Sequence, residues 1–279
     1  MLLCFERHFL FLNKILKLKK FIYLKLFTFS IVTLFLACST SDDSYQNTST
    51  TFNEPLNNND SNDDSNGGSS DNSSATTNQN FKLLSLGDSY TIGQSVCETC
   101  RFPEQLKDSL TTKFNADTNF ELKVIARTGW TTSNLINAIK TENLLYNYDL
   151  VTLLIGVNNQ YQGHPFSLYE TEFPQLVNNA ILLAKGDKTN VIVISIPDYA
   201  YTPYGNGNEN ISKDIDKYNE FSKAYCTINN ISFVNITDIT RQGLENPNLV
   251  ASDGLHPSSL AYSLFVDRLL PMAVDKLKN

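Results

Sequence analysis

The stretch from Phe81 to Gly93 reads FKLLSLGDSYTIG. Its first six residues form a short, mostly apolar run of the kind that builds a buried strand. Gly87 then allows the chain to turn at a point where a side chain would clash. Ser89 follows directly, just past the carboxyl end of this strand. That edge is where open parallel α/β sheets bind ligands.

Four further apolar runs are short enough to be strands, and longer segments with helical periodicity lie between them. The predicted strands are 81–86, 122–126, 150–156, 191–196 and 231–234, and the predicted helices are 102–114, 131–140, 167–184, 211–229 and 258–278. Strands that alternate with helices of this length indicate a parallel sheet covered on both faces. We therefore expect an α/β protein, a three-layer α/β/α sandwich with a five-stranded parallel sheet.

The first 37 residues have the parts of a secretory signal. Basic residues precede an apolar run, 26–37, which ends in the small residue Ala37 before Cys38. A cysteine in this position resembles the lipobox of bacterial lipoproteins, whose cysteine is acylated. We therefore expect a lipid on Cys38 that anchors the protein to a membrane of the cell envelope. An uncleaved anchor helix and a plain signal peptide are the alternatives.

Residues 38–80 are expected to be a disordered tether. The segment is rich in Ser, Thr, Asn and Asp and, from residue 39 on, contains acidic residues but no lysine or arginine. Such a composition buries too little apolar surface to offset the entropy of ordering. Residues 81–279 then form one globular domain. The net charge of the chain is −7, and no basic stripe is present, so nucleic acid is not an expected partner.

Four short segments follow predicted strands or precede the last predicted helix. They are GDSY at 87–90, RTGW at 127–130, GVNN at 156–159 and DGLHP at 253–257. In a parallel sheet of this topology, all of them meet at one edge. In this order, GDSY, the glycine after the second strand, GVNN and DGLH resemble the SGNH (GDSL-type) hydrolase family. The resemblance covers 81 to the end of the chain.

This resemblance implies a flavodoxin-like fold and hydrolysis of an ester through an acyl-enzyme, with no metal or organic cofactor. Ser89 would be the nucleophile, but a serine needs a base at neutral pH. Outside the leader, the chain has only His164 and His256. Asp253 lies three residues before His256, close enough to hold Nδ1 of the imidazole and fix its tautomer. Ser89, His256 and Asp253 are therefore the expected triad.

The resemblance also implies an oxyanion hole. Its donors would be the backbone N–H groups of Ser89 and Gly129 and the side-chain amide of Asn158. The family usually has aspartate after that asparagine, where this chain has Asn159. We expect Asn159→Asp to be near neutral, because it exchanges one group that braces the loop for another.

Aromatic residues are frequent near this edge. The loop 197–208 contains three tyrosines, among them Tyr199, and Trp130 and Tyr161 follow other strands. Trp130, Tyr161 and Tyr199 are candidates to line a sugar or acyl pocket. The alternative is aromatic packing that holds the long loop in place.

Cys97 and Cys100 form a C-x-x-C sequence. In an exported protein this spacing favours a short structural disulfide, with free thiols and metal or redox chemistry as the alternatives. A zinc site would need two further ligands. No metal site is expected.

The sequence as a whole predicts a serine esterase of the cell envelope that acts on an O-acyl ester. Alternatives with the same fold are a carbohydrate O-deacetylase, an acyltransferase and a lysophospholipase. An alternative of a different class is a surface binding module with an idle triad.

Overall fold

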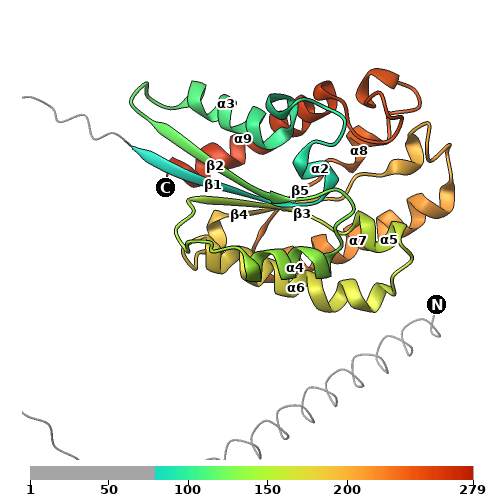
Figure 1. Cartoon of the computed structure of the whole chain (residues 1–279), viewed down its shortest axis with the longest axis horizontal. Coiled ribbons are helices and arrows are strands. Elements are labelled where there is room, and N and C mark those ends of the chain that lie inside the picture. The colour runs from blue at the N-terminus through green and yellow to red at the C-terminus, as the bar shows by residue number, and fades with distance from the viewer. Residues whose placement is uncertain (1–78, 279) are drawn as a thin grey trace, which may run out of the picture. The chain divides into compact units, whose positions relative to one another are not determined.

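A computed structural model describes residues 79–278 (Figure 1). The expected signal peptide (1–37) and Cys38 lie outside the described residues, as does all of the expected tether but its last two residues. The first strand begins at Asn80, one residue before the expected start of the domain. Within residues 79–278, no helix is both long and apolar enough to cross a membrane.

Five parallel strands form one sheet in the order β2-β1-β3-β4-β5. The strands are β1 (Asn80–Gly87), β2 (Asn119–Ala126), β3 (Leu150–Leu154), β4 (Val191–Ile194) and β5 (Ser232–Val234). Every residue of β3 and β4 is buried. Strands with such nearly continuous apolar runs need cover on both faces of the sheet.

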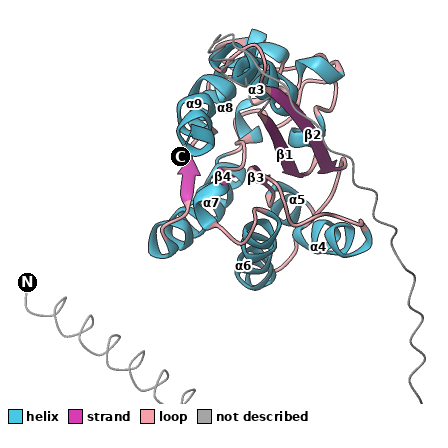
Figure 2. Cartoon of the chain, turned by 90° about the vertical axis from the view of Figure 1, so that its left-hand side faces the viewer, coloured by secondary structure: helices cyan, strands magenta, loops and turns pink. Residues whose placement is uncertain are grey.

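Helices supply that cover in two layers (Figures 1 and 2). On one face, α3 (Phe102–Lys113) packs against α9 (Ser259–Lys278), with α8 (Thr237–Thr240) beside α9. The other face carries α4 (Thr132–Thr141), α6 (Phe166–Leu183) and α7 (Glu209–Asn229). The predicted three-layer sandwich is confirmed, and each predicted strand and helix is present with shifted ends.

The sequence patterns did not predict the short helices. Two of them, α2 (Ser89–Ile92) and α5 (Val157–Tyr161), follow β1 and β3. Within residues 79–278 there are also four 3₁₀ turns, at Glu98–Cys100, Lys188–Asn190, Tyr199–Tyr201 and Pro247–Leu249. Elements of three to five residues are too short to show a helical period in the sequence.

Two glycines determine how the chain leaves β1 and β3. At Gly87, an added Cβ would lie 2.1 Å from Oγ1 of Thr91 and 2.4 Å from the carbonyl oxygen of Leu154. At Gly156, φ is +133° and an added Cβ would lie 2.5 Å from the ring of Tyr169. Only glycine fits these positions, because the backbone approaches its neighbours too closely for any side chain. Both short helices therefore begin at the carboxyl edge of the sheet.

Candidate active site

Ser89 is the first residue of α2, directly beyond β1, and its exposed fraction is 4%. The Asp88 carboxylate caps this helix, because its Oδ1 accepts a 3.0 Å hydrogen bond from the backbone N–H of Tyr90. Burial raises the pKa of Asp88 to about 7, against the opposing effect of hydrogen bonds from Tyr90 and Asn158. A buried carboxyl group with such a pKa is typical of functional sites.

Asp253 and His256 form a direct pair. Oδ2 of Asp253 lies 2.6 Å from Nδ1 of His256, and Oδ1 accepts hydrogen bonds from the backbone N–H groups of Leu255 and His256 at 2.9 and 3.0 Å. Because the carboxylate holds Nδ1, the other imidazole nitrogen, Nε2, remains for proton transfer. The two residues expected to act together are therefore in contact.

Asp253 has a further partner that the sequence did not reveal. The hydroxyl of Ser95 donates a 2.6 Å hydrogen bond to Oδ2, the same oxygen that faces His256. Partial burial by itself would raise the pKa of Asp253, but the hydrogen bonds from Ser95 and His256 outweigh burial and hold the pKa well below its usual range. The carboxylate is thus ionised throughout the neutral range.

Asn158 lies in α5, and its side-chain amide contacts Asp88, the residue before Ser89. Nδ2 donates a 3.0 Å hydrogen bond to the backbone carbonyl of Trp130 and a longer one, 3.4 Å, to Oδ2 of Asp88. The segment after β2, which carries Gly129, is therefore tied to the segment after β3. Gly129 is fixed in turn by the side chain of Gln162, which donates a 2.9 Å hydrogen bond to the glycine carbonyl.

A cavity of about 170 Å³ brings the predicted residues together. Ser89, Gly129, Asn158 and His256 all line its wall, although they come from four distant parts of the chain. The remaining wall is mostly apolar or aromatic and consists of Tyr90, Thr128, Val157, Tyr161, Tyr199 and Leu255. Within the described residues, Ser89 Oγ has no hydrogen bond to His256. Such bonds are often long in unliganded enzymes and tighten when substrate binds.

Of the three aromatic candidates, two line the cavity and one does not. Tyr161 and Tyr199 form part of the wall, but Trp130 is not one of the lining residues. Its half-buried side chain packs against the hydrophobic core, and its backbone carbonyl holds Asn158. The prediction that Trp130 contacts substrate is therefore not supported. Its position after a strand indicated the correct edge, but sequence cannot give the direction of the side chain.

Tyrosines at the rim form a cluster of three rings. The hydroxyls of Tyr161 and Tyr204 lie 2.7 Å apart, and the two residues are 54% and 53% exposed. Tyr199 is buried beneath them and donates a 2.8 Å hydrogen bond to Oε1 of Gln160. Burial raises the pKa of Tyr199 to about 12, so its hydroxyl stays protonated. The ring contacts hold the loop in place, and two members of the cluster, Tyr161 and Tyr199, also line the cavity.

Asn159 has a different environment from the one expected. It is fully buried, and its Oδ1 accepts a 2.9 Å hydrogen bond from the backbone N–H of Thr132. Its Nδ2 donates at 2.6 Å to Oγ1 of Thr132, whose hydroxyl proton goes to Glu172. An aspartate here would compete with Glu172 for that single proton. From these contacts we now expect Asn159→Asp to be destabilising rather than near neutral.

A family model described as the GDSL-like lipase/acylhydrolase family matches residues 85–264, well over half of the chain. No curated protein matches the chain.

Among similar solved structures is Axe2, an acetylxylan esterase from Geobacillus stearothermophilus, with a TM-score of 0.55 and 20% identity over 69% of this chain and 94% of that one. The lipase/acylhydrolase from Enterococcus faecalis has a TM-score of 0.56 and 17% identity over 70% of this chain and 96% of that chain. At these identities the structures show a shared fold. Together with the family model, they show that the chain belongs to the GDSL-like lipase/acylhydrolase family of ester-hydrolysing enzymes.

Proposed function

We propose that the protein is a serine esterase that hydrolyses an O-acyl ester through an acyl-enzyme, with Ser89, His256 and Asp253 as its triad. The observation that carries the proposal is the cavity itself, which Ser89, Gly129, Asn158 and His256 line, with Asp253 on Nδ1 of His256 at 2.6 Å. A nucleophile, a base with its orienting group and candidate oxyanion donors therefore face one small space.

In the first half of the reaction, Oγ of Ser89 attacks the ester carbonyl carbon while Nε2 of His256 takes the hydroxyl proton. Asp253 stabilises the resulting imidazolium. Collapse of the tetrahedral intermediate breaks the bond to the alcohol, which leaves with the proton from His256. In the second half, water attacks the acyl-serine with His256 as base, releases the carboxylic acid and restores Ser89.

The negative charge on the tetrahedral oxygen needs donors that are already oriented. We assign these donors to the backbone N–H groups of Ser89 and Gly129 and to Nδ2 of Asn158. The 3.0 Å hydrogen bond from Nδ2 to the carbonyl of Trp130 orients the amide. The 3.4 Å bond to Asp88 is the weaker of the two, so the N–H that makes it is the one that can be given to a better acceptor.

The size of the cavity favours a short acyl group. Its volume of about 170 Å³ is below the roughly 300–1,000 Å³ of pockets that enclose drug-sized ligands. The wall is mostly apolar, which suits the methyl end of an acetyl or similar group. A long acyl chain would have to lie largely outside the cavity.

A test of the mechanism compares the full chain with Ser89→Ala on a series of p-nitrophenyl esters from acetate to decanoate. We expect kcat/KM to be highest for the shortest esters and to fall by about three orders of magnitude or more in Ser89→Ala. Ser109→Ala, on α3 and outside the cavity wall, is the matched control and should retain full activity. Retention of a tenth of the activity in Ser89→Ala would exclude this mechanism, and absence of turnover in the wild type would favour the idle binding module.

The tyrosines at the rim favour a second, narrower candidate, a carbohydrate O-deacetylase. Exposed aromatic rings beside a catalytic cavity offer an apolar face to the apolar face of a sugar ring. Tyr161 and Tyr204 are more than half exposed and hold each other by their hydroxyls. One solved structure with the same fold is an acetylxylan esterase.

For this candidate, we expect Tyr204→Ala to raise KM for an acetylated xylo-oligosaccharide severalfold and to leave p-nitrophenyl acetate unaffected. Tyr146→Ala, an exposed tyrosine outside the cavity wall, is the control. Equal effects of Tyr204→Ala on both substrates would count against a sugar-binding role.

We also propose that the enzyme is held in the cell envelope by lipid on Cys38. The basic and apolar leader with a cysteine after Ala37 supports this location. In a Gram-negative host, Cys38→Ala should move the protein from the membrane to the soluble envelope fraction. Mass spectrometry that finds an unmodified Cys38, or an intact leader in the mature protein, would refute the anchor.

A further inference from the structure

Ser95 stands out because its backbone and its side chain are both unusual. It is an exposed residue in the loop after α2, and its φ is +69°, a left-handed conformation that L-serine adopts rarely. Its hydroxyl nevertheless reaches across the fold to Oδ2 of Asp253, at 2.6 Å. The strained conformation aims the side chain at the carboxylate that holds His256.

Oδ2 of Asp253 therefore receives two short contacts, from Ser95 and from Nδ1 of His256, both at 2.6 Å. The other oxygen, Oδ1, is occupied by backbone N–H groups of its own loop. Among the described residues, Ser95 thus supplies the hydrogen bond that holds this carboxylate from outside its own loop. A hydrogen bond of this kind acts indirectly: by holding the Asp253 carboxylate, Ser95 also orients the His256 ring that the carboxylate contacts.

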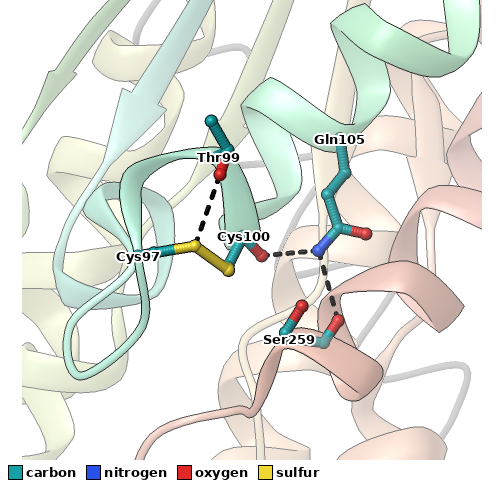
Figure 3. Close-up of a disulfide and its surroundings, with 5 residues drawn as sticks. All are labelled: Cys97, Thr99, Cys100, Gln105 and Ser259. Carbon is teal, nitrogen blue, oxygen red and sulfur yellow. Dashed lines mark hydrogen bonds between the residues drawn. A yellow bond between two sulfur atoms is a disulfide. The ribbon is translucent and has the colours of Figure 1, made fainter.

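A disulfide turn begins two residues after Ser95. Cys97 and Cys100 are bonded across the 3₁₀ turn Glu98–Cys100. The side chain of Gln105 donates hydrogen bonds both to the carbonyl of Cys100 and to the carbonyl of Ser259, at 2.5 and 3.2 Å (Figure 3).

Ser259 is the first residue of α9 and follows His256 by three positions. The residues that flank the disulfide turn, Ser95 before it and Gln105 after it, therefore contact the chain on both sides of the Asp253–His256 loop. Ser95 contacts Asp253 at its beginning, and Gln105 contacts Ser259 after its end. The disulfide closes the turn 97–100 and so restricts the backbone next to Ser95. This restriction makes it harder for Ser95 to leave its left-handed conformation.

We propose that Ser95 is a positioning residue for Asp253 and His256, and that the Cys97–Cys100 disulfide turn is the brace that holds Ser95 in place. The proposal rests on the esterase function above. Its consequence is that turnover depends on the oxidation state of this pair. When a dithiol reduces the turn, the bond between the two sulfur atoms breaks and two cysteine thiols form. The dithiol supplies two electrons and two protons and becomes a disulfide.

The test uses the full chain with p-nitrophenyl acetate. Ser95→Gly removes the hydroxyl, and glycine accepts the left-handed backbone without strain. We expect kcat to fall roughly ten- to hundredfold, as for loss of a hydrogen bond to a charged group, with KM unchanged. Asn230→Gly is the matched control, because Asn230 is also exposed and left-handed, with φ +54°, but caps α7. It should leave kcat unchanged.

The coupling between Ser95 and the disulfide is then measured by a double-mutant cycle. Replacement of both cysteines by serine, or reduction with dithiothreitol followed by alkylation, should lower kcat in the wild type. The same treatment should have little further effect in Ser95→Gly. Independent, multiplicative losses would show that the turn does not act through Ser95, and a Ser95→Gly activity within twofold of wild type would overturn the positioning role.

A second readout does not depend on turnover. The Nδ1 proton of His256, held by Asp253, should give a far-downfield proton resonance in NMR spectra that moves or broadens in Ser95→Gly but not in Asn230→Gly. An unchanged resonance would also overturn the proposal. If the wild type hydrolyses the ester and Ser89→Ala does not, a normal Ser95→Gly refutes the positioning role alone. An inactive wild type refutes the esterase function itself.

Discussion

The side-chain amide of Asn159 donates a 2.6 Å hydrogen bond to Oγ1 of Thr132, and the hydroxyl of Thr132 in turn donates a hydrogen bond to Oε2 of Glu172. These hydrogen bonds join α5, the start of α4 and α6. Ser133 adds a further hydrogen bond to Glu172 at 2.7 Å. Because a hydroxyl has one proton, it can serve only one carboxylate. The asparagine at this position and the glutamate on α6 therefore fit each other.

From this network we expect Asn159→Asp to lower the free energy of unfolding by roughly 1–3 kcal/mol, because it leaves a buried acceptor without a donor. Adding Glu172→Gln should recover much of the loss, since the amide of glutamine can donate to Thr132 while the hydroxyl serves the new carboxylate. Urea unfolding of the single and double variants measures the coupling. Additive losses would show that the two positions are independent.

Asn158 should behave differently from its neighbour. If its amide stabilises the oxyanion, Asn158→Ala should lower kcat by about 10²–10³-fold, or 2.7–4 kcal/mol, with KM little changed. Asn158→Asp should be at least as harmful, because it sets a second carboxylate beside Asp88 and loses the donor to Trp130. Steady-state kinetics measure the effect, with the exposed Asn137→Ala on α4 as control. Equal, small losses at positions 158 and 159 would remove Asn158 from the site.

The raised pKa of Asp88 predicts a pH dependence of stability. Burial raises this pKa from 3.8 to about 7, so between these values the folded protein keeps a proton that the unfolded chain has released. The contribution of Asp88 to stability is therefore fully present below pH 3.8 and is lost as the pH rises through about 7. Asp88→Asn still has an oxygen for the backbone of Tyr90 and should remove this decline. The midpoints of urea unfolding at pH 5 and pH 8 test this prediction for the wild type and Asp88→Asn. The same change in midpoint between the two pH values in both proteins would contradict it.

The loop that carries Tyr199 depends on a buried carboxylate. Asp198 is fully buried, accepts a 2.9 Å hydrogen bond from Nε of Arg241 and caps the 3₁₀ turn through the backbone of Ala200. Arg241→Ala leaves this charge without its guanidinium. We expect the free energy of unfolding to fall by about 3 kcal/mol, the lower end for a broken buried pair, because the arginine is partly exposed.

Arg268→Ala is the control for this change. Arg268 pairs with the exposed Asp238, and such surface pairs contribute about 1 kcal/mol or less. Urea unfolding of both variants should therefore give clearly different losses. Similar losses would mean that the Asp198 carboxylate is stabilised without Arg241.

The sequence by itself determined the fold and the edge at which the site forms. Apolar runs of strand length between helical segments specify a parallel sheet, because the hydrophobic pattern of each element is a local property of the chain. Asp253 and His256 are three residues apart, so their contact could also be expected from local geometry. The motifs at the strand ends place Ser89, Gly129 and Asn158 at one edge of the sheet.

Tertiary structure alone decided which side chains turn towards the cavity and what holds them. Ser95 contacts Asp253 across 158 positions of sequence, and no pattern around either residue indicates the other. Trp130 packs against the outside of the core and Tyr204 contacts Tyr161, although both follow strands at the same edge. Side-chain direction and long-range hydrogen bonds depend on how whole elements pack, and a linear pattern contains only the spacing along one element at a time.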